Sequence, residues 1–264
     1  MATRKMSVGQ AIIEFLSHQY TVDGDHRERT IAGVFGIFGH GNVAGIGQAL
    51  KQLSTSDPGL MPYHQARNEQ AMVHESSAFA RIKRRRATFA CAASVGPGAT
   101  NMLTGAAVAT TNRLPVLLLP SDTFANRSSD PVLQQLEVPH DASISVNDAF
   151  KPLSRFFDRV QRPEQVFSAL LGAMRVLTDP VETGAVTICL PEDVQAEVIE
   201  VPEEFLADRE WHIRRPRAEA SVLAEAARVI AGTSPGTIFF LNRMLLIETK
   251  LVFMPAYSGL HRNV

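Results

Sequence analysis

Apolar residues recur along this chain with two alternating periods. Helical spacing is found at 8–16, 43–53, 69–83, 100–110 and 163–177, and short, largely apolar runs of strand length occupy 31–39, 87–94, 115–120 and 185–191. Runs of strand length that alternate with amphipathic helices are typical of a parallel sheet whose two faces are both covered. We therefore predict an α/β fold with a doubly wound, mostly parallel sheet and helices on both faces.

Local signals set some of the predicted helix boundaries. Ser7 and Gln10 have the spacing of a capping box at the start of the first helix. Asn42 is expected to open a second helix whose apolar face includes Val43. Pro163 is expected at the first position of the last helix of the sheet domain, where its missing N–H costs nothing.

The pattern changes near residue 200, where the sequence becomes polar and contains prolines. This change in composition predicts a sheet domain at 1–200 and a linker at 201–217. A new amphipathic helix starts after residue 218, but the tail from 237 has weak periodicity and no further strand–helix unit. We expect 218–264 to be the incomplete start of a second domain.

Composition excludes several functional classes. The net charge is −1, with 45% hydrophobic and 20% charged residues, so nothing indicates a nucleic-acid or membrane partner. No apolar stretch is long enough to span a bilayer. Cys91 and Cys189 lie in apolar runs, which favours two free buried thiols and a cytoplasmic location. The basic run at 81–86 is interpreted as a solvated helix end, with an anion- or partner-binding patch as the alternative.

Two patterns that could indicate a cofactor or a metal are weak. The glycines of 39–47 follow a dinucleotide-binding pattern, but no acidic residue follows at the required distance, so a tight turn beside a ligand or interface is favoured. His64, Glu69 and His74 are five residues apart, which rotates each by about 140° around a helix. They cannot share a face, and no metal site is predicted. On local pattern alone, Glu69 is an exposed first-turn carboxylate.

The stretch SVGPGATN, residues 94–101, runs from a strand through glycines into a helix. Such an arrangement can hold a phosphate. Neither a lysine nor a magnesium ligand accompanies it here, so the pattern alone leaves open whether the loop holds a phosphate or lies beside another part of a ligand.

The order of the motifs adds a resemblance. FGIFG, ARNEQAM, ASVGPGATNMLTGAAVA, NRLPVLLLPSD and AVTICLPEDV follow one another as in the N-terminal, pyrimidine-binding domain of thiamine-diphosphate-dependent enzymes. The resemblance covers roughly residues 6–200. It implies that Glu69 hydrogen-bonds N1′ of the cofactor's pyrimidine and stabilises the tautomer whose imino group acts as the base. It also implies lesser roles for other residues. Cofactor contacts would come from Gly36, Phe38, Ser94, Gly96 and Asn101, and a substrate-side amide from Gln134 or Gln135.

Further stretches, such as AGVFGIFGHGNVAGIGQAL and RLPVLLLPSDTFANR, are similar to the branch of this family that opens a trihydroxycyclohexane-1,2-dione ring in myo-inositol catabolism. The resemblance implies a hydrolase of C–C bonds that acts on a small polyol-derived dione as a homodimer or tetramer. The GDG and downstream Asn that hold Mg²⁺ and the diphosphate in this family are not found. We therefore expect half of an active site and no activity of the chain alone. An acetolactate-synthase-like decarboxylase or carboligase, or a non-catalytic cofactor-binding or dimerisation module, remains an alternative.

Overall fold

The computed structural model describes residues 2–214 and 217–232, and the chain divides into two units, Met1–Arg214 and Arg215–Val264. Within the described part of the second unit, helix α9 spans Ala220–Ala231. The predicted tail from 237 lies outside the described residues.

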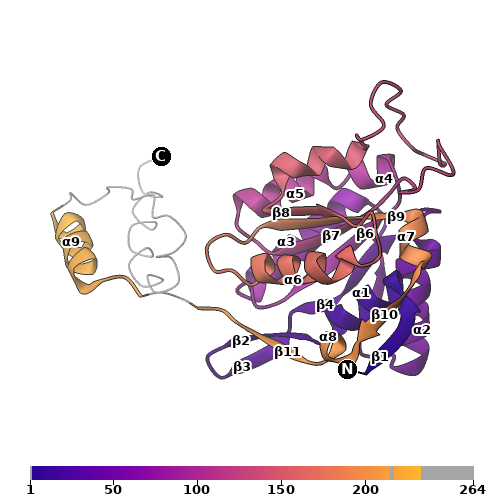
Figure 1. Cartoon of the computed structure of the whole chain (residues 1–264). Helices are drawn as coiled ribbons and strands as arrows, with labels where there is room; N and C mark the ends of the chain where they lie inside the picture. The colour runs from indigo at the N-terminus through magenta and orange to yellow at the C-terminus, as the bar shows by residue number, and fades with distance from the viewer. Residues whose placement is uncertain (1, 215–216, 233–264) are drawn as a thin grey trace. The chain divides into compact units, whose positions relative to one another are not determined.

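A six-stranded parallel sheet forms the centre of the first unit (Figure 1). Its order is β5-β4-β6-β7-β9-β8, and every neighbouring pair is parallel. The strands are β4 (Ile31–Ile37), β5 (Tyr63–Gln65), β6 (Thr88–Ala93), β7 (Val116–Asp122), β8 (Phe156–Arg159) and β9 (Ala185–Pro191). Every residue of β7 and of β9 is buried, as their continuous apolar runs require.

Helices cover both faces of this sheet, which confirms the predicted fold class. Successive residues of β7 point to opposite faces, so Leu117 and Leu119 join one hydrophobic cluster while Val116 and Leu118 join the other. The first cluster includes residues of α1 (Val8–Ser17), α2 (Gln48–Ser56), α6 (Gln165–Leu177), α7 (Glu192–Ala196) and α8 (Glu203–Leu206). The second includes residues of α3 (Glu69–Ile82), α4 (Pro97–Thr100), α5 (Leu103–Thr111) and the 3₁₀ helix η2 (Val146–Leu153).

The helix starts agree only partly with the sequence. The capping box of Ser7 and Gln10 is confirmed. The prediction that Val43 is buried is wrong: it is 53% exposed, because 43–47 form a π-helix, η1, before α2 begins. Asn42 does not cap that helix through its side chain, but donates from Nδ2 to the carbonyl of Ala93 at 2.9 Å. Pro163 lies in the turn before α6, which begins at Gln165.

Most of the segment expected to be a linker belongs to the first unit. Strand β10 (Val198–Pro202) pairs antiparallel with β1 (Thr3–Ser7). Strand β11 (Arg209–His212) pairs parallel with β2 (Gln19–Asp23), which also pairs with β3 (His26–Arg29). The division between units falls after Arg214. Charged residues and prolines are compatible with such short peripheral strands, which is why the sequence resembles a linker there.

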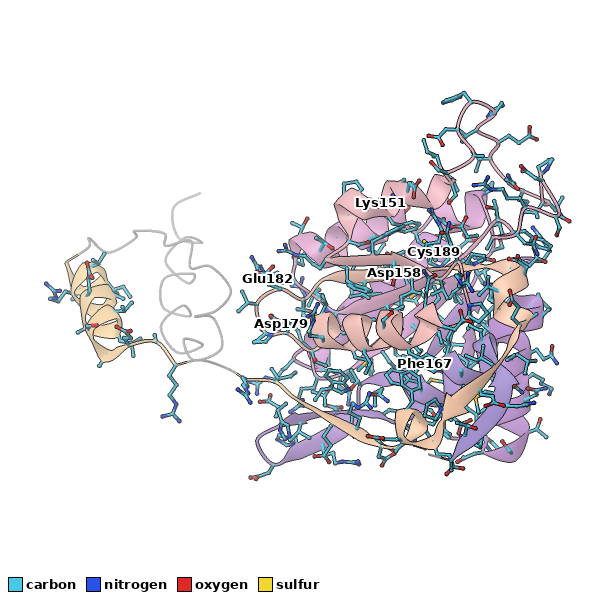
Figure 2. All side chains as sticks on the ribbon, in the orientation of Figure 1. Lys151, Asp158, Phe167, Asp179, Glu182 and Cys189 are labelled. Carbon is cyan, nitrogen blue, oxygen red and sulfur yellow. The ribbon has the colours of Figure 1, made fainter. Side chains whose placement is uncertain are left out.

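Both cysteines are buried, and two residues of the basic run form ion pairs. Cys91 and Cys189 are free and buried, as predicted, and Figure 2 shows Cys189 in the region of the central sheet. The basic run starts in the last turn of α3, where Lys83 and Arg86 both pair with Glu28, at 2.9 and 2.8 Å. No helix within 2–214 or 217–232 is long and apolar enough to cross a membrane.

Candidate functional site

The carboxyl edge of the sheet gathers most of the predicted site residues. Gly36 lies near the end of β4 and Phe38 just beyond it, while Ser94 and Gly96 follow β6. Glu69 is the first residue of α3, shortly after β5. Since β5, β4 and β6 are neighbours in the sheet, and neighbouring strands are about 4.8 Å apart, these positions share a short length of one edge.

Glu69 is held in a defined position at the start of α3. Asn68 caps the helix by accepting from the backbone N–H of Ala71 at 2.9 Å, so the carboxylate sits in the first turn, where the helix dipole favours it. Asn101 Nδ2 donates to Glu69 Oε2 at 2.8 Å. Oε1 has no hydrogen bond to any residue in the described part of the chain. One oxygen of this half-buried carboxylate is thus fixed, and the other can meet a ligand.

Gly98 keeps the space beside this carboxylate open. A Cβ at Gly98 would lie 2.6 Å from Ser94 Oγ and 3.4 Å from Glu69 Oε1. Any other residue would therefore push against Ser94 and crowd the oxygen that has no hydrogen bond. The structure thus brings Glu69, Ser94 and Asn101 together around one small gap.

Two aromatic rings lie over the end of β4. The rings of Phe38 and Tyr63 are stacked, with centroids 5.2 Å apart and planes inclined by 15°. The Tyr63 hydroxyl donates to the Gly36 carbonyl at 3.1 Å, and burial raises the pKa of this phenol. A Cβ at Gly36 would lie 2.9 Å from the Tyr63 ring. Sequence reasoning missed Tyr63, because a strand of three residues is too short to show a period.

The turn of 39–42 is fixed by three neighbouring elements. A Cβ at Gly39 would lie 2.6 Å from Ser94 Cβ. The Gly41 carbonyl accepts hydrogen bonds from Ser121 Oγ at the end of β7 and from Gln195 Nε2 of α7, the latter at 2.9 Å. The glycines of this segment therefore serve close packing in a tight turn, as the sequence indicated.

His40 lies within this turn and was also missed from the sequence. Its Nε2 atom is buried and has no hydrogen-bond partner among the described residues. Burial raises the pKa of Glu192 at the start of α7, while the nearby His40 lowers it and Asp193 raises it. The only signal available in the sequence was a histidine between two glycines, which a structural turn explains equally well.

The long loop after β7 rests on Gly96. Gly96 has φ of +67°, and a Cβ there would lie 1.9 Å from the carbonyl oxygen of Gln134. The side chain of Gln135 is occupied within the loop: it accepts from the Val132 N–H at 2.9 Å and donates to Asp130 at 2.6 Å. Gln134 contacts Gly96 through its backbone and its side chain is exposed. Substrate contacts by either glutamine stay predictions.

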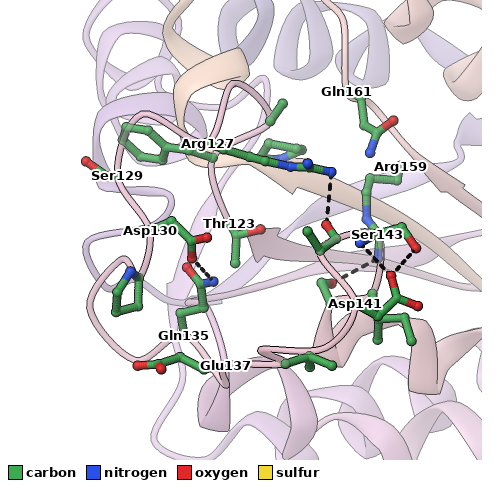
Figure 3. A pocket seen from close by; sticks show the side chains of 18 of the residues that line it. Thr123, Arg127, Ser129, Asp130, Gln135, Glu137, Asp141, Ser143, Arg159 and Gln161 are labelled. Atoms are coloured by element: carbon green, nitrogen blue, oxygen red, sulfur yellow. Dashed lines mark hydrogen bonds between the residues drawn. The ribbon is translucent and has the colours of Figure 1, made fainter.

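A cavity of about 250 Å³ lies between this loop and the ends of β7, β8 and β9 (Figure 3). Arg159 forms part of its wall, donating to Asp122 at 2.7 Å, to Asp148 at 2.7 Å and to Ser145 at 2.9 Å. Burial opposes ionisation of Asp148, but hydrogen bonds and charge from Arg159 and Lys151 outweigh it and lower its pKa.

The two histidines that flank Glu69 in the sequence, His64 and His74, contact aromatic and amide side chains. His64 packs against the rings of Phe35 and Phe89, which also contact each other, and His74 is 3.2 Å from the Gln70 amide. Within residues 2–214 and 217–232, no three His, Cys, Asp or Glu side chains are grouped so as to hold a metal ion.

Comparison with known proteins fits this geometry. Residues 27–143 match the family described as thiamine pyrophosphate enzyme, N-terminal TPP binding domain. This region is therefore similar to a TPP-binding domain. Thiamine pyrophosphate (TPP) is thiamine diphosphate, so the match confirms the resemblance inferred from the order of the motifs. The matched residues contain β4 to β7 and all the predicted site positions.

Longer relatives carry a common name. The chain is 51% identical over 230 residues to a protein of Geobacillus thermodenitrificans (strain NG80-2), covering 87% of this chain and 35% of the relative. It is 50% identical over 230 residues to a protein of Bacillus thuringiensis (strain Al Hakam), with the same coverage. It is 50% identical over 226 residues to a protein of Clostridium perfringens (strain 13 / Type A), covering 86% and 35%. Each is named 3D-(3,5/4)-trihydroxycyclohexane-1,2-dione hydrolase, and this chain spans about a third of their length.

Proposed function

We propose that this chain is the N-terminal part of a TPP-dependent hydrolase that cleaves a C–C bond of a trihydroxycyclohexane-1,2-dione ring in myo-inositol catabolism. Identity of about half the residues to relatives of that name supports the reaction. The observation that carries the proposal is the Glu69 carboxylate, with one oxygen held by Asn101 and the other without a partner among the described residues.

The residues at the carboxyl edge fit the pyrimidine end of the cofactor. Glu69 Oε1 would share a proton with the ring nitrogen N1′, and Asn101 would keep the carboxylate from turning away. Bound TPP supplies the nucleophilic carbon that attacks a carbonyl group. The remaining contacts would position that ring and exclude water, and we assign them to Gly36, Phe38, Ser94 and Gly96.

We infer that Mg²⁺ and the diphosphate bind in a part of the relatives that this chain does not span, since hard oxygen ligands in a GDG…Asn arrangement are not found in the sequence. On this proposal the chain alone is inactive. The complete site would form between subunits of a homodimer or tetramer in the cytoplasm, a location that two free thiols support.

A chimera tests the proposed function. Residues 1–214 of this chain would replace the corresponding part of the Geobacillus relative, and opening of the ring dione would be followed with and without TPP and Mg²⁺. We expect hydrolysis that requires both and no hydrolysis by the chain alone. Pyruvate decarboxylation without ring opening would favour the acetolactate-synthase-like alternative, and a folded chimera with neither activity would favour a non-catalytic module.

A further inference from the structure

The turn that carries His40 packs closely on its neighbours on both sides of this residue. Just before it, a Cβ at Gly39 would lie 2.6 Å from Ser94 Cβ. Just after it, a Cβ at Gly41 would lie 2.6 Å from Val95 Cγ2. The backbone on either side of His40 is therefore fixed by contacts that only glycine allows, and such a fixed position is what a reacting group requires.

Ser94 also borders the gap in front of the Glu69 carboxylate. Its Oγ atom would lie 2.6 Å from a Cβ at Gly98, and the same Cβ would lie 3.4 Å from Glu69 Oε1. Gly39 and Gly98 thus pack against one serine side chain. The turn that contains His40 and the proposed cofactor site therefore share a wall.

The His40 ring has a nitrogen atom without a partner. Its Nε2 atom is shielded from solvent and has no hydrogen bond to any residue within 2–214 or 217–232. A buried polar atom without a partner costs free energy, and most such atoms in native proteins are paired. A ligand that hydrogen-bonds Nε2 would remove this cost. The unpaired nitrogen therefore indicates a group that meets its partner only when a ligand is bound.

Helix α7 brings a carboxylate toward His40. Gln195 of this helix donates to the Gly41 carbonyl at 2.9 Å, which anchors α7 on the turn. Glu192 lies three residues before Gln195, and residues at this spacing share one face of a helix. The electrostatics agree with this placement: the nearby His40 lowers the pKa of Glu192, against the rise that burial causes. Glu192 is therefore a neighbour of the imidazole.

The other acidic residues that α7 and β7 place near the turn are already engaged. Asp193 accepts from two backbone N–H groups of the loop after β7, at 2.9 and 3.1 Å. Asp122 at the end of β7 pairs with Arg159 at 2.7 Å. The causes that shift the pKa of Glu192 are burial and the charges of His40 and Asp193, and no hydrogen bond is among them. Glu192 is thus the carboxylate left to stabilise a positive charge on His40.

An imidazole held in place beside a carboxylate can transfer a proton to an oxygen atom that gains negative charge. The proposed reaction supplies such an atom, because the oxygen of a ketone becomes negative when its carbon is attacked. The Nε2–H bond of the imidazolium breaks, an O–H bond forms, and the ring becomes neutral. The same nitrogen takes the proton back when the carbonyl group forms again, so that the imidazolium is restored.

We propose that His40 is a catalytic residue whose Nε2 atom transfers a proton to and from a carbonyl oxygen of the substrate, with Glu192 as the positioning residue that stabilises the imidazolium. This assignment rests on the proposed function. It gives the site a second proton-transfer group in addition to Glu69.

Steady-state kinetics of the chimera with the Geobacillus relative test this inference. Glutamine in place of His40 keeps a hydrogen-bond donor but has no proton to transfer. His40→Gln should lower kcat about a hundredfold and abolish the alkaline limb of the kcat/KM profile, which reports loss of the proton donor. Glu192→Gln should move that limb to lower pH, because the imidazolium loses its anionic neighbour. The control His26→Gln, on the exposed strand β3, should change neither.

Two measurements on the full chain separate this role from a structural one. Because Nε2 has no partner to lose, His40→Leu should leave the urea midpoint unchanged or raise it, whereas loss of a residue needed for packing would lower it. In a ¹³C NMR titration, His40→Gln should raise the pKa of the Glu192 carboxyl further, since the neighbour that lowers it is gone. Circular dichroism shows whether each variant is folded.

Several results would overturn the assignment: a His40→Gln chimera that retains more than a tenth of the parent kcat, an unchanged alkaline limb in that chimera, or a lowered urea midpoint of His40→Leu. Each of them leaves the proposed function intact as long as the parent chimera opens the ring. A folded parent chimera that does not open the ring would refute the proposed function, and the assignment of His40 with it.

Discussion

The ion pairs of Arg159 offer the sharpest stability prediction. Its guanidinium bridges the end of β8 to Asp122 at the end of β7 and to Asp148 at the start of η2. The side chain of Asp122 is only 2% exposed and that of Arg159 only 14%. Replacing Arg159 with methionine keeps much of the volume but leaves a buried carboxylate without its cation.

The magnitude follows from this burial. Removing one partner of a buried ion pair costs about 3–5 kcal/mol, because the remaining charge is uncompensated. The Asp148 side chain is 21% exposed, so its loss of a partner adds less. We expect Arg159→Met to lower the free energy of unfolding by about 3–4 kcal/mol, out of a total of about 5–15 kcal/mol for a typical domain.

Urea denaturation followed by circular dichroism measures this loss, and Arg155→Met is the matched control. Arg155 pairs at 3.3 Å with Glu182, and both side chains are far more exposed, at 33% and 61%. That exposed pair should contribute less than about 1 kcal/mol. The double variant Arg159→Met/Asp122→Asn should recover part of the loss. A loss below about 1 kcal/mol for Arg159→Met, equal to the control, would refute the reasoning.

Three further predictions follow from the same structure. Gly96→Ala should destabilise the chain by about 2 kcal/mol or more and shift the loop of 123–145, because Gly96 has a positive φ and a Cβ there would clash with the Gln134 carbonyl. The control Gly59→Ala has open space around it and should change the free energy of unfolding by less than about 0.5 kcal/mol in the same urea assay. Because the pKa of Asp148 is lowered in the folded protein, its contribution to stability is present above the unfolded pKa of about 3.9 and is lost as the pH falls through the folded value. In urea titrations over that acid range, the free energy of unfolding of Asp148→Asn should therefore fall less steeply with decreasing pH than that of the parent chain. Burial raises the pKa of Cys91 to about 12, so its thiol should react with a disulfide reagent at pH 8 only after unfolding, and rapid reaction of the native protein would contradict its burial.

The sequence predicted the central sheet well because its strands are buried on both faces. Runs such as 115–120 and 185–191 contain almost no polar residues, and only a covered parallel strand accommodates them. The short peripheral strands β1, β10 and β11 carry charged residues and prolines, and their pairing depends on chain segments nearly two hundred residues apart. No local pattern contains that information, so the region was predicted to be a linker.

The sequence predicted the site residues that belong to a recognisable motif. It did not predict those that reach the site only through the folding of the chain. Glu69 and Asn101 lie 32 residues apart, and only the resemblance indicated that they meet, as they do at 2.8 Å. Tyr63 and His40 have no motif of their own and are placed by a short strand and by a turn held from β7 and α7. The cavity depends on the path of a long loop, which residue spacing does not determine.

The role of Glu69 is the central claim, and the turnover of the Glu69→Gln chimera tests it most directly. Glutamine keeps the size and can accept from Asn101, but it cannot exchange a proton with the cofactor. Glu75→Gln, on an exposed position of the same helix, serves as the matched control. The account predicts that Glu69→Gln lowers kcat for TPP-dependent ring opening by more than about tenfold, equivalent to about 1.4 kcal/mol of transition-state stabilisation, while the control stays within about twofold. A Glu69→Gln chimera that retains more than a tenth of the parent kcat would contradict it.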